Sequence, residues 1–449
     1  MYKQSIYTQN NIDKVPQVQA LNKDLLFEIK LMANILPFRV NNYVIENLID
    51  WEKAPDDPIF RMMFPSRDMI SEEDFSEMVD VILGKGTPQE IENCAQRIRS
   101  KLNPHPGGQS KYNVPHHNGS RLEGVQHKYK ETVLLFPKEG KVCFSYCMFC
   151  FRWAQFVNTD EVVFSLDKKQ DFFQYISERE DVTDLLITGG DPMVMRAEQF
   201  AQYIDELCKP DYGHIKNIRI GTKVLSFWPH RFTTDPDADD LLRLFEKLNL
   251  AGKHVTFMAH FNHYREMEND VVTQAIKRIQ NAGIIIRSQS PILRHVNDAP
   301  GVWTKMWNMQ LELGIIPYYM FIERNTGANK YYELPLGQVS EIFRKAVRNI
   351  SGLGKTVKGP VMSAANGKVE ILGTRKLDNK DTMILRYVQC RDPELNYVPF
   401  FAEYKSTDTW FDQLYPLNES DEAFFNISSD TAHDVVSFDE KSLLQVATS

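Results

Sequence analysis

The sequence predicts an α/β protein built on an open barrel of six βα units, with a helical region before the barrel and an extension after it. Six short apolar runs alternate with helical stretches across the middle of the chain, which is the pattern of βα units and a parallel sheet. The 449 residues, of which 43% are hydrophobic, can bury a large core. Because consecutive right-handed crossovers curl a parallel sheet, six units are expected to give an open barrel.

Residues 1–125 are expected to form a helical region that ends in a linker loop. Leu21–Leu36 mixes apolar and charged residues as a helix does, and Asn41–Asp50 follows it. Ser71 with three acidic residues behind it is typical of a capped helix start. A second helix is predicted over Pro88–Ser100, and the stretch 103–124 is rich in Gly, Pro, Asn and His, which indicates a loop.

Residues 126–350 are expected to form the barrel. The predicted strands are Thr132–Pro137, Asp184–Thr188, Asn217–Lys223, His254–Phe261, Ile284–Gln289 and Ile315–Ile322. In a barrel of this kind the active site lies at the carboxyl ends of the strands. The polar motifs described below fall at such an end or in the loop just after it, so we expect them to form one site.

Residues 351–449 are expected to form a C-terminal segment and tail. The last barrel helix is predicted over Gly337–Ile350, and a Gly-rich break follows it. Lys355–Leu372 and Met383–Val388 read as strand-like runs. Glu419–Ser449 is acidic and rich in serine, and we expect a partly mobile tail or an oligomer contact there.

Composition excludes several classes of function. A net charge of −8 argues against a nucleic-acid-binding surface. No apolar run approaches the ~20 residues that a membrane span needs, and Met1–Asn10 is too polar for a signal peptide. Clustered, reduced cysteines fit the cytoplasm, where disulfides are rare. A cytoplasmic protein without a membrane segment is expected.

Three of the six cysteines form the pattern C-x3-C-x2-C, at Cys143, Cys147 and Cys150, directly after the first predicted strand. Thiolates this close together suit an iron–sulfur cluster. A 4Fe–4S cube takes four ligands, so three cysteines leave one iron open. A structural zinc site would close its shell with a fourth ligand, and no other Cys or His lies beside this loop. A disulfide fits an odd count of cysteines poorly, so zinc and core cysteines are the minor alternatives.

The cysteine loop resembles the signature of the radical S-adenosylmethionine (SAM) enzymes, and its context resembles the lysine 2,3-aminomutase family. The resemblance runs from about Glu123 to Lys368 and implies a partial (β/α)6 barrel with a C-terminal segment that binds pyridoxal phosphate (PLP). The motifs that carry it, in the family's order, are the cysteine loop with Arg152, Gly189-Gly190-Asp191-Pro192, His260-Phe261-Asn262-His263 and Leu293-Arg294-His295-Val296-Asn297-Asp298.

The resemblance implies that the three cysteines ligate a 4Fe–4S cluster whose open iron chelates SAM. It places Gly189, Gly190 and Asp191 at the amino group of SAM, and His260 and Gln289 near SAM and the second cofactor. Taken alone, the Gly-Gly-Asp motif favours a plain strand-to-helix turn. His260 and Gln289 taken alone are equally well explained as polar residues of a barrel rim.

The resemblance also implies that Lys368 forms a Schiff base with PLP and that Lys128 and Tyr129 help to seat this cofactor. A desolvated lysine has the lowered pKa that imine formation requires, whereas a surface lysine in a turn is the alternative. The chain departs from the family in three ways. Only one glycine, Gly367, remains of the usual run before the lysine, and Lys128 and Thr132 stand where arginines are usual.

Substrate choice is where the sequence departs most from the family. Arg152 keeps the position that pairs with the substrate α-carboxylate, a role that suits a bidentate guanidinium. Lysine aminomutases hold the distal ammonium with two aspartates, and this chain has Arg324 and Val361 there. A buried cationic side chain would meet a like charge at Arg324, so the sequence favours an acidic substrate over lysine. Glu323, if it turned inward, would restore a pocket for a cationic substrate.

We therefore expect a radical SAM, PLP-dependent amino-acid 2,3-aminomutase that uses a 4Fe–4S cluster. Its partners would be a small amino-acid substrate, an electron donor such as flavodoxin or ferredoxin, and further copies of the chain. A radical SAM enzyme without PLP, a lysine 2,3-aminomutase with a rearranged pocket, and a non-enzymatic cluster-binding protein are the alternatives. The remaining cysteines, Cys94, Cys208 and Cys390, are not clustered, so no zinc site is predicted.

Overall fold

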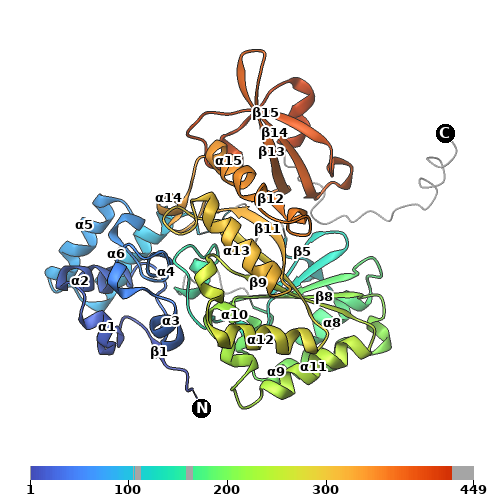
Figure 1. The fold of residues 1–449 in the computed structure, drawn as a ribbon, viewed down its shortest axis with the longest axis horizontal. Coiled ribbons are helices and arrows are strands. Elements are labelled where there is room, and N and C mark those ends of the chain that lie inside the picture. Colours follow the sequence, from blue (N-terminus) through green and yellow to red (C-terminus); the bar gives the residue numbers. More distant parts are fainter. Residues whose placement is uncertain (1, 105, 107–112, 158–164, 427–449) are drawn as a thin grey trace.

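The structure is a computed structural model that describes residues 2–104, 106, 113–157 and 165–426. Among these residues twelve strands form one continuous sheet, in the order β16-β15-β14-β13-β12-β11-β10-β9-β8-β7-β6-β5 (Figure 1). Strands β6 to β12 run parallel, whereas β5 at one end and β13 to β16 at the other pair antiparallel. This large sheet with interleaved helices confirms the α/β class.

All six predicted strands are present and begin at, or one residue after, the predicted position. The strands are β6 Thr132–Leu135, β7 Asp184–Ile187, β8 Asn217–Thr222, β9 His254–His260, β10 Ile285–Ile292 and β11 Ile316–Ile322. They form because β-branched and aromatic residues recur in short runs between turn residues. Their buried side chains pack into the main hydrophobic core.

The connecting helices lie outside these strands, and α9 packs beside α11 as α13 packs beside α15 (Figure 1). The helices are α8 Lys169–Ser177, α9 Ala197–Leu207, α10 Val224–Phe227, α11 Ala238–Leu250, α12 Asp270–Asn281, α13 Pro300–Glu312, α14 Asn329–Tyr332 and α15 Leu336–Val347. No helix in the described part of the chain is long and apolar enough to cross a membrane.

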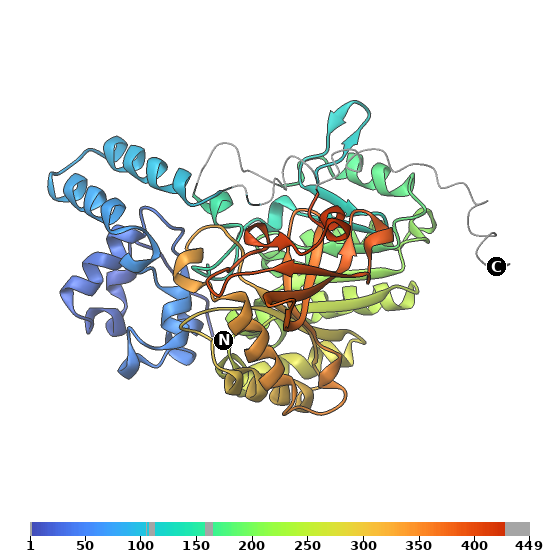
Figure 2. The same cartoon turned by 90° about the horizontal axis from the view of Figure 1, so that it is seen from above.

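The N-terminal helices form a separate group beside the sheet (Figures 1 and 2). They are α1 Pro16–Gln19, α2 Lys23–Met32, α3 Asn42–Asn47, α4 Pro58–Met63, α5 Glu72–Leu83 and α6 Pro88–Lys101, with a two-stranded ribbon of β1 Ile6–Tyr7 and β2 Val40–Asn41. The Ser71 side chain accepts a hydrogen bond from the Asp74 backbone N–H at 3.1 Å, so the predicted cap of α5 is confirmed. Within the predicted linker loop, β3 His116–His117 and β4 Ser120–Arg121 form a small hairpin.

The C-terminal strands continue the parallel sheet. They are β12 Lys358–Ser363, β13 Gly367–Leu377, β14 Lys380–Cys390, β15 Pro399–Glu403 and β16 Tyr415–Pro416, and β5 Val125–Tyr129 closes the opposite end. Phe400 and Phe424 stack with ring centroids 4.5 Å apart over this layer. Of the predicted tail, residues 419–426 include a short 3-10 helix, and residues 427–449 lie outside the described part of the chain.

Candidate active site

A cavity of about 350 Å³ opens at the carboxyl ends of the parallel strands. Its walls come from the ends of β6 to β11, from β5, and from the β13–β14 pair. Every site residue that the sequence predicts lines this cavity: Lys128, Tyr129, Cys143, Cys147, Cys150, Arg152, Gly189, Gly190, Asp191, His260, Gln289, Arg324 and Lys368. The cavity is of the size that small-molecule and cofactor sites have.

The three loop cysteines are free and project into the cavity. Burial raises the pKa of each thiol, to about 11 for Cys150, and the charges of Asp191, Cys150 and Cys147 raise the pKa of Cys143 further. Bound iron would reverse this shift, because a coordinating thiol is deprotonated. No group of three His, Cys, Asp or Glu in the described ranges converges on a single metal ion. A cube of four irons spreads its ligands, so the thiols fit a cluster.

The N-terminal helical region holds the cysteine loop in place. The Tyr146 N–H donates to the Arg39 carbonyl at 2.8 Å, and the Met148 N–H donates to the Met62 carbonyl at 2.9 Å. Asn41 is fully buried, and its side-chain amide donates to the Phe227 carbonyl at 2.8 Å. The sequence pattern of the first hundred residues does not predict that they support the cysteine loop, because these hydrogen bonds join segments far apart in the chain.

Gly189 and Gly190 let the end of β7 approach the beginning of the cysteine loop. The Asp191 N–H donates to the Gly140 carbonyl at 3.1 Å and to the Val142 carbonyl at 2.8 Å. A Cβ on Gly190 would lie 2.5 Å from the Val142 carbonyl oxygen, and Gly189 has a φ of +152°, so both positions require glycine. The Gly189–Asp191 motif therefore joins the end of β7 to the cysteine loop.

The Asp191 carboxylate is bound within the protein. It accepts hydrogen bonds from Thr222 Oγ1 at 2.7 Å, from the Lys223 N–H at 2.9 Å and from the Met193 N–H at 3.0 Å. Burial raises its pKa to about 6, and these hydrogen bonds oppose that shift. The backbone of the motif, rather than this carboxylate, is left to contact a ligand.

His260 and Gln289 lie opposite each other on adjacent strands at the cavity wall. Burial lowers the pKa of His260 to about 3, and the charge of Lys223 contributes, so the imidazole is neutral. Lys223 is a cavity residue that the sequence did not single out. Its Nζ donates to Asn262 Oδ1 at 2.9 Å and to the fully buried carboxylate of Glu266 at 2.6 Å, which fixes the loop after β9.

Cationic side chains gather at the end of the cavity near β5 and β12. Lys128 Nζ donates to the Ala364 carbonyl at 2.8 Å, and Arg324 donates to the Ser363 carbonyl at 3.2 Å. Burial lowers the pKa of Lys128 well below its usual value, and the charges of Arg391, Arg324 and Lys368 lower it further. An anion would relieve this repulsion. The group therefore fits the phosphate of PLP, although the usual arginines are absent at 128 and 132.

Lys368 is the second residue of β13, and its amine lies between two aromatic rings. The Nζ atom is 5.3 Å from the ring centroid of Tyr129 and 5.5 Å from that of Tyr319. Burial lowers the pKa of the amine to about 7, and the charge of Arg219 adds to this effect. Gly367 before it allows β14 to pack closely, because a Cβ there would lie 2.2 Å from the Gln389 carbonyl oxygen.

Arg152 and Arg324 flank the ring of Phe151. Their guanidinium carbons lie 5.1 Å and 4.6 Å from its centroid. Arg152 also donates to the Gly189 carbonyl at 2.8 Å. Burial lowers the pKa of each arginine to about 10, and the charge of Arg324 lowers that of Arg152 further. Two partly buried guanidinium groups thus face one cavity.

Glu323 also lines the cavity, and its side chain is buried. Its Oε1 atom accepts no hydrogen bond from the described residues. Burial raises the pKa of this carboxyl well above its usual value, against the opposing charge of Arg324. Glu323 therefore turns inward, which is the orientation under which the sequence allows a pocket for a cationic substrate.

The Leu293–Asp298 motif lies outside the cavity wall. Asn297 is fully buried, and its amide donates to the Asn262 carbonyl at 3.0 Å and to the Pro291 carbonyl at 3.1 Å. The motif thus joins the loops after β9 and β10. Cys94 and Cys390 are buried away from the cluster loop, and Cys208 is partly buried at the end of α9.

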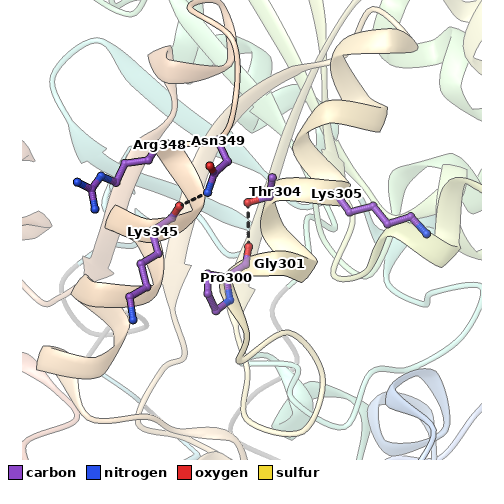
Figure 3. A pocket seen from close by; sticks show the side chains of 7 residues that line it. All are labelled: Pro300, Gly301, Thr304, Lys305, Lys345, Arg348 and Asn349. Atoms are coloured by element: carbon purple, nitrogen blue, oxygen red, sulfur yellow. Dashed lines mark hydrogen bonds between the residues drawn. The ribbon is translucent and has the colours of Figure 1, made fainter.

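A wide surface depression elsewhere does not resemble an active site. It lies between the start of α13 and the end of α15, and its lining includes Pro300, Thr304, Lys345 and Arg348 (Figure 3). The long basic side chains point away from one another in this view. Its lining contains no cysteine, histidine or carboxylate.

Comparisons with known proteins place the chain in one family. No family model matches it. A protein of Aquifex aeolicus (strain VF5), named "Putative L-lysine 2,3-aminomutase", is 31% identical over 393 residues, which cover 87% of this chain and 91% of the relative. The L-lysine 2,3-aminomutases of Bacillus subtilis (strain 168) and Clostridium subterminale are 25% and 24% identical, over 71% and 62% of this chain. The chain spans 64% and 65% of those two relatives.

Streptococcus suis SuiB bound to precursor peptide SuiA is a solved structure with 13% identity and a TM-score of 0.34, over 61% of this chain and 56% of that one. Lysine 2,3-aminomutases are radical SAM enzymes that use a 4Fe–4S cluster, SAM and PLP. On the strength of the Aquifex relative and the shared motifs, this chain belongs to the lysine 2,3-aminomutase family of radical SAM enzymes.

Proposed function

We propose that the protein is a PLP-dependent amino-acid 2,3-aminomutase, which interconverts an α-amino acid and its β-isomer. The observation that carries the proposal is that three free cysteines and a partly buried lysine with a pKa of about 7 face the same cavity. When bound, the cluster with SAM supplies a 5′-deoxyadenosyl radical that abstracts hydrogen from the substrate, and PLP carries the migrating amine. The protein binds and orients these cofactors and the substrate, and it excludes water from them.

Cys143, Cys147 and Cys150 would hold the cluster, and the backbone of Gly189 and Gly190 would face SAM. His260 and Gln289 complete this end of the cavity from two neighbouring strands. A neutral imidazole accepts as well as donates hydrogen bonds, so His260 suits a polar ligand group without adding charge beside the cluster.

Lys368 would bind PLP through its amine, and Lys128 with Arg324 and Arg391 would surround the phosphate. Tyr129 packs between these groups, within cation–π distance of both Lys128 and Lys368. A flat ring placed there has an amine at one end and cations at the other. That arrangement matches the shape and charge of the cofactor.

We infer that the substrate is acidic rather than lysine. Arg152 would fix the α-carboxylate of the substrate. Arg324 contacts the same Phe151 ring as Arg152 and would bind a second carboxylate. It also borders the group of cations proposed for the phosphate. Val361, at the second family aspartate position, is fully buried and offers no charge. Glu323, which lines the same cavity, keeps lysine as the alternative substrate.

The wider organisation follows the same reasoning. We propose three parts, with residues 1–125 supporting the cysteine loop, 126–350 forming a partial (β/α)6 barrel, and 351–449 binding PLP. Reduction of the cluster would require an electron donor such as flavodoxin or ferredoxin in the cytoplasm. Association into homo-oligomers is part of the same proposal.

The test is a PLP titration of anaerobically purified protein, followed in the visible spectrum. Wild type is expected to give a new band that saturates near one equivalent, and Lys368→Ala is expected to give none. Lys376→Ala is the matched control, because Lys376 is an exposed lysine on the same strand and should leave the band unchanged. Iron–sulfur absorbance without any PLP band in wild type would refute amino migration.

A second candidate is a radical SAM enzyme that works without PLP. The observation that favours it is Thr132, which is buried and donates to Asp184 at 3.3 Å where an arginine would serve the cofactor. Cleavage of SAM under strong reductant by a protein that does not bind PLP would support this candidate.

A further inference from the structure

The strand pair that carries Lys368 turns a second polar side chain toward the cavity. Gln389 of β14 faces Lys368 of β13 across the antiparallel ladder, and the register shifts at the next pair, so that Val388 is an extra residue. Such bulges re-aim side chains beside active sites. Gln389 lines the same cavity as Lys368.

A chain of two hydrogen bonds runs from the lysine to the protein surface. Lys368 Nζ donates to Gln389 Oε1 at 2.9 Å, and Gln389 Nε2 donates to Glu131 Oε1 at 3.0 Å. An ammonium or amine donates here and a carboxylate only accepts, so the Gln389 amide can satisfy both neighbours in one orientation. Glu131 itself is anchored, because its carbonyl accepts from the N–H groups of Thr183 and Asp184 at 3.1 Å and 3.0 Å.

We propose that Gln389, held in one orientation by Glu131, is a positioning residue for the Lys368 amine; this inference rests on the proposed role of Lys368. The amide oxygen takes one N–H of the amine and leaves the nitrogen lone pair free to face a carbonyl carbon in the cavity. Because the amide is neutral, it stabilises the ammonium form, which has no lone pair to attack with, far less than a carboxylate in the same place would.

The charges around Lys368 are consistent with this role. Glu131 lies on the β5–β6 turn, Asp184 on β7, Arg219 on β8, Lys358 on β12 and Lys128 on β5. Asp184 is bound by Arg219 through two contacts of 2.8 Å and 2.7 Å, so its charge is offset. The neutral amide therefore stands between the amine and the carboxylate of Glu131.

The first arm of the test measures the amine without PLP. Limiting acetic anhydride would label the protein over a range of pH, and mass spectrometry of the Lys368 peptide would give the midpoint of labelling. The double variant Glu131→Gln, Gln389→Glu keeps the hydrogen-bond chain and the net charge. It places a carboxylate, instead of the amide, in the hydrogen bond with the Lys368 amine. We expect its midpoint to rise by at least about one pH unit, a tenfold loss of neutral amine at a given pH below it. Glu131→Gln alone is the control for the surface charge.

The second arm measures PLP trapped on Lys368 by borohydride. Gln389→Met keeps the size of the side chain but accepts no strong hydrogen bond, and we expect about tenfold less trapping at subsaturating PLP. Equal midpoints in wild type and the double variant, or equal trapping in Gln389→Met, would overturn the inference. A shifted midpoint with no trapping in wild type would support the positioning of the amine and refute PLP as the ligand.

Discussion

Gly190→Ala gives a direct test of the contact between the Gly-Gly-Asp motif and the cysteine loop. The added Cβ would lie 2.5 Å from the Val142 carbonyl carbon and oxygen and 2.6 Å from the Lys141 carbonyl carbon. All three atoms are backbone, so the cysteine loop must move as a unit. Overpacking of this kind costs about 1–3 kcal/mol, and a fixed backbone places the cost at the upper end. At about 3 kcal/mol the affinity for the cluster would fall roughly 150-fold.

The assay is iron and sulfide content per chain after anaerobic reconstitution with limiting iron, with the thermal unfolding curve measured beside it. Gly301→Ala is the control, because Gly301 has no atom within 4 Å of an added Cβ and lies in helix α13. We expect Gly301→Ala to bind iron as wild type does and Gly190→Ala to bind little. Wild-type iron content in Gly190→Ala would refute the argument that this contact shapes the cluster loop.

Three further predictions concern the support of the cluster, the substrate and the lysine. Asn41→Ala removes the buried donor to the Phe227 carbonyl, so the iron–sulfur absorbance should decay faster in chelator, by a factor that reflects about 1–3 kcal/mol; an unchanged decay rate would argue against N-terminal support. Arg324→Gln, measured at saturating PLP because Arg324 also borders the proposed phosphate site, should lower kcat/KM for dicarboxylic amino acids by about 10- to 100-fold and spare monocarboxylic ones. An equal loss for both would contradict the acidic-substrate proposal. Burial and Arg219 lower the pKa of Lys368 to about 7, and only the neutral amine reacts, so the PLP band should grow as pH rises through 7; a midpoint near the ordinary lysine pKa of about 10.4 would contradict it.

The parallel strands and the place of the candidate site at their carboxyl ends follow from local sequence patterns. The strands that carry His260 and Gln289 are runs of β-branched and apolar residues, and parallel strands bring their carboxyl ends to one edge of a sheet. A motif at the carboxyl end of each strand therefore lies near the cavity, regardless of the conformation of the connections between the strands. Gly189 and Gly190 also follow a strand, but the resemblance to the family, and not the local pattern, assigned them to the site.

Other features depend on contacts that no local pattern encodes. Asn41 is hydrogen-bonded to Phe227, 186 positions away in the chain, and Lys223 is hydrogen-bonded to Glu266, 43 positions away. Neither pair can be predicted from a short window of sequence. The register shift beside Lys368 adds one residue to β14 without changing its composition. Asp191 was expected at SAM as part of its motif, yet its carboxylate is bound by Thr222 and the backbone, which the motif alone does not reveal.

The claim of amino migration is tested most directly by following the substrate nitrogen. Reconstituted protein with SAM, PLP and dithionite would be incubated with glutamate and with lysine carrying ¹⁵N at the α-position, and the products examined by NMR. We expect the label to move to the β-carbon for an acidic amino acid and to stay in place for lysine. Formation of 5′-deoxyadenosine while the label remains on the α-carbon of every amino acid would contradict the aminomutase assignment.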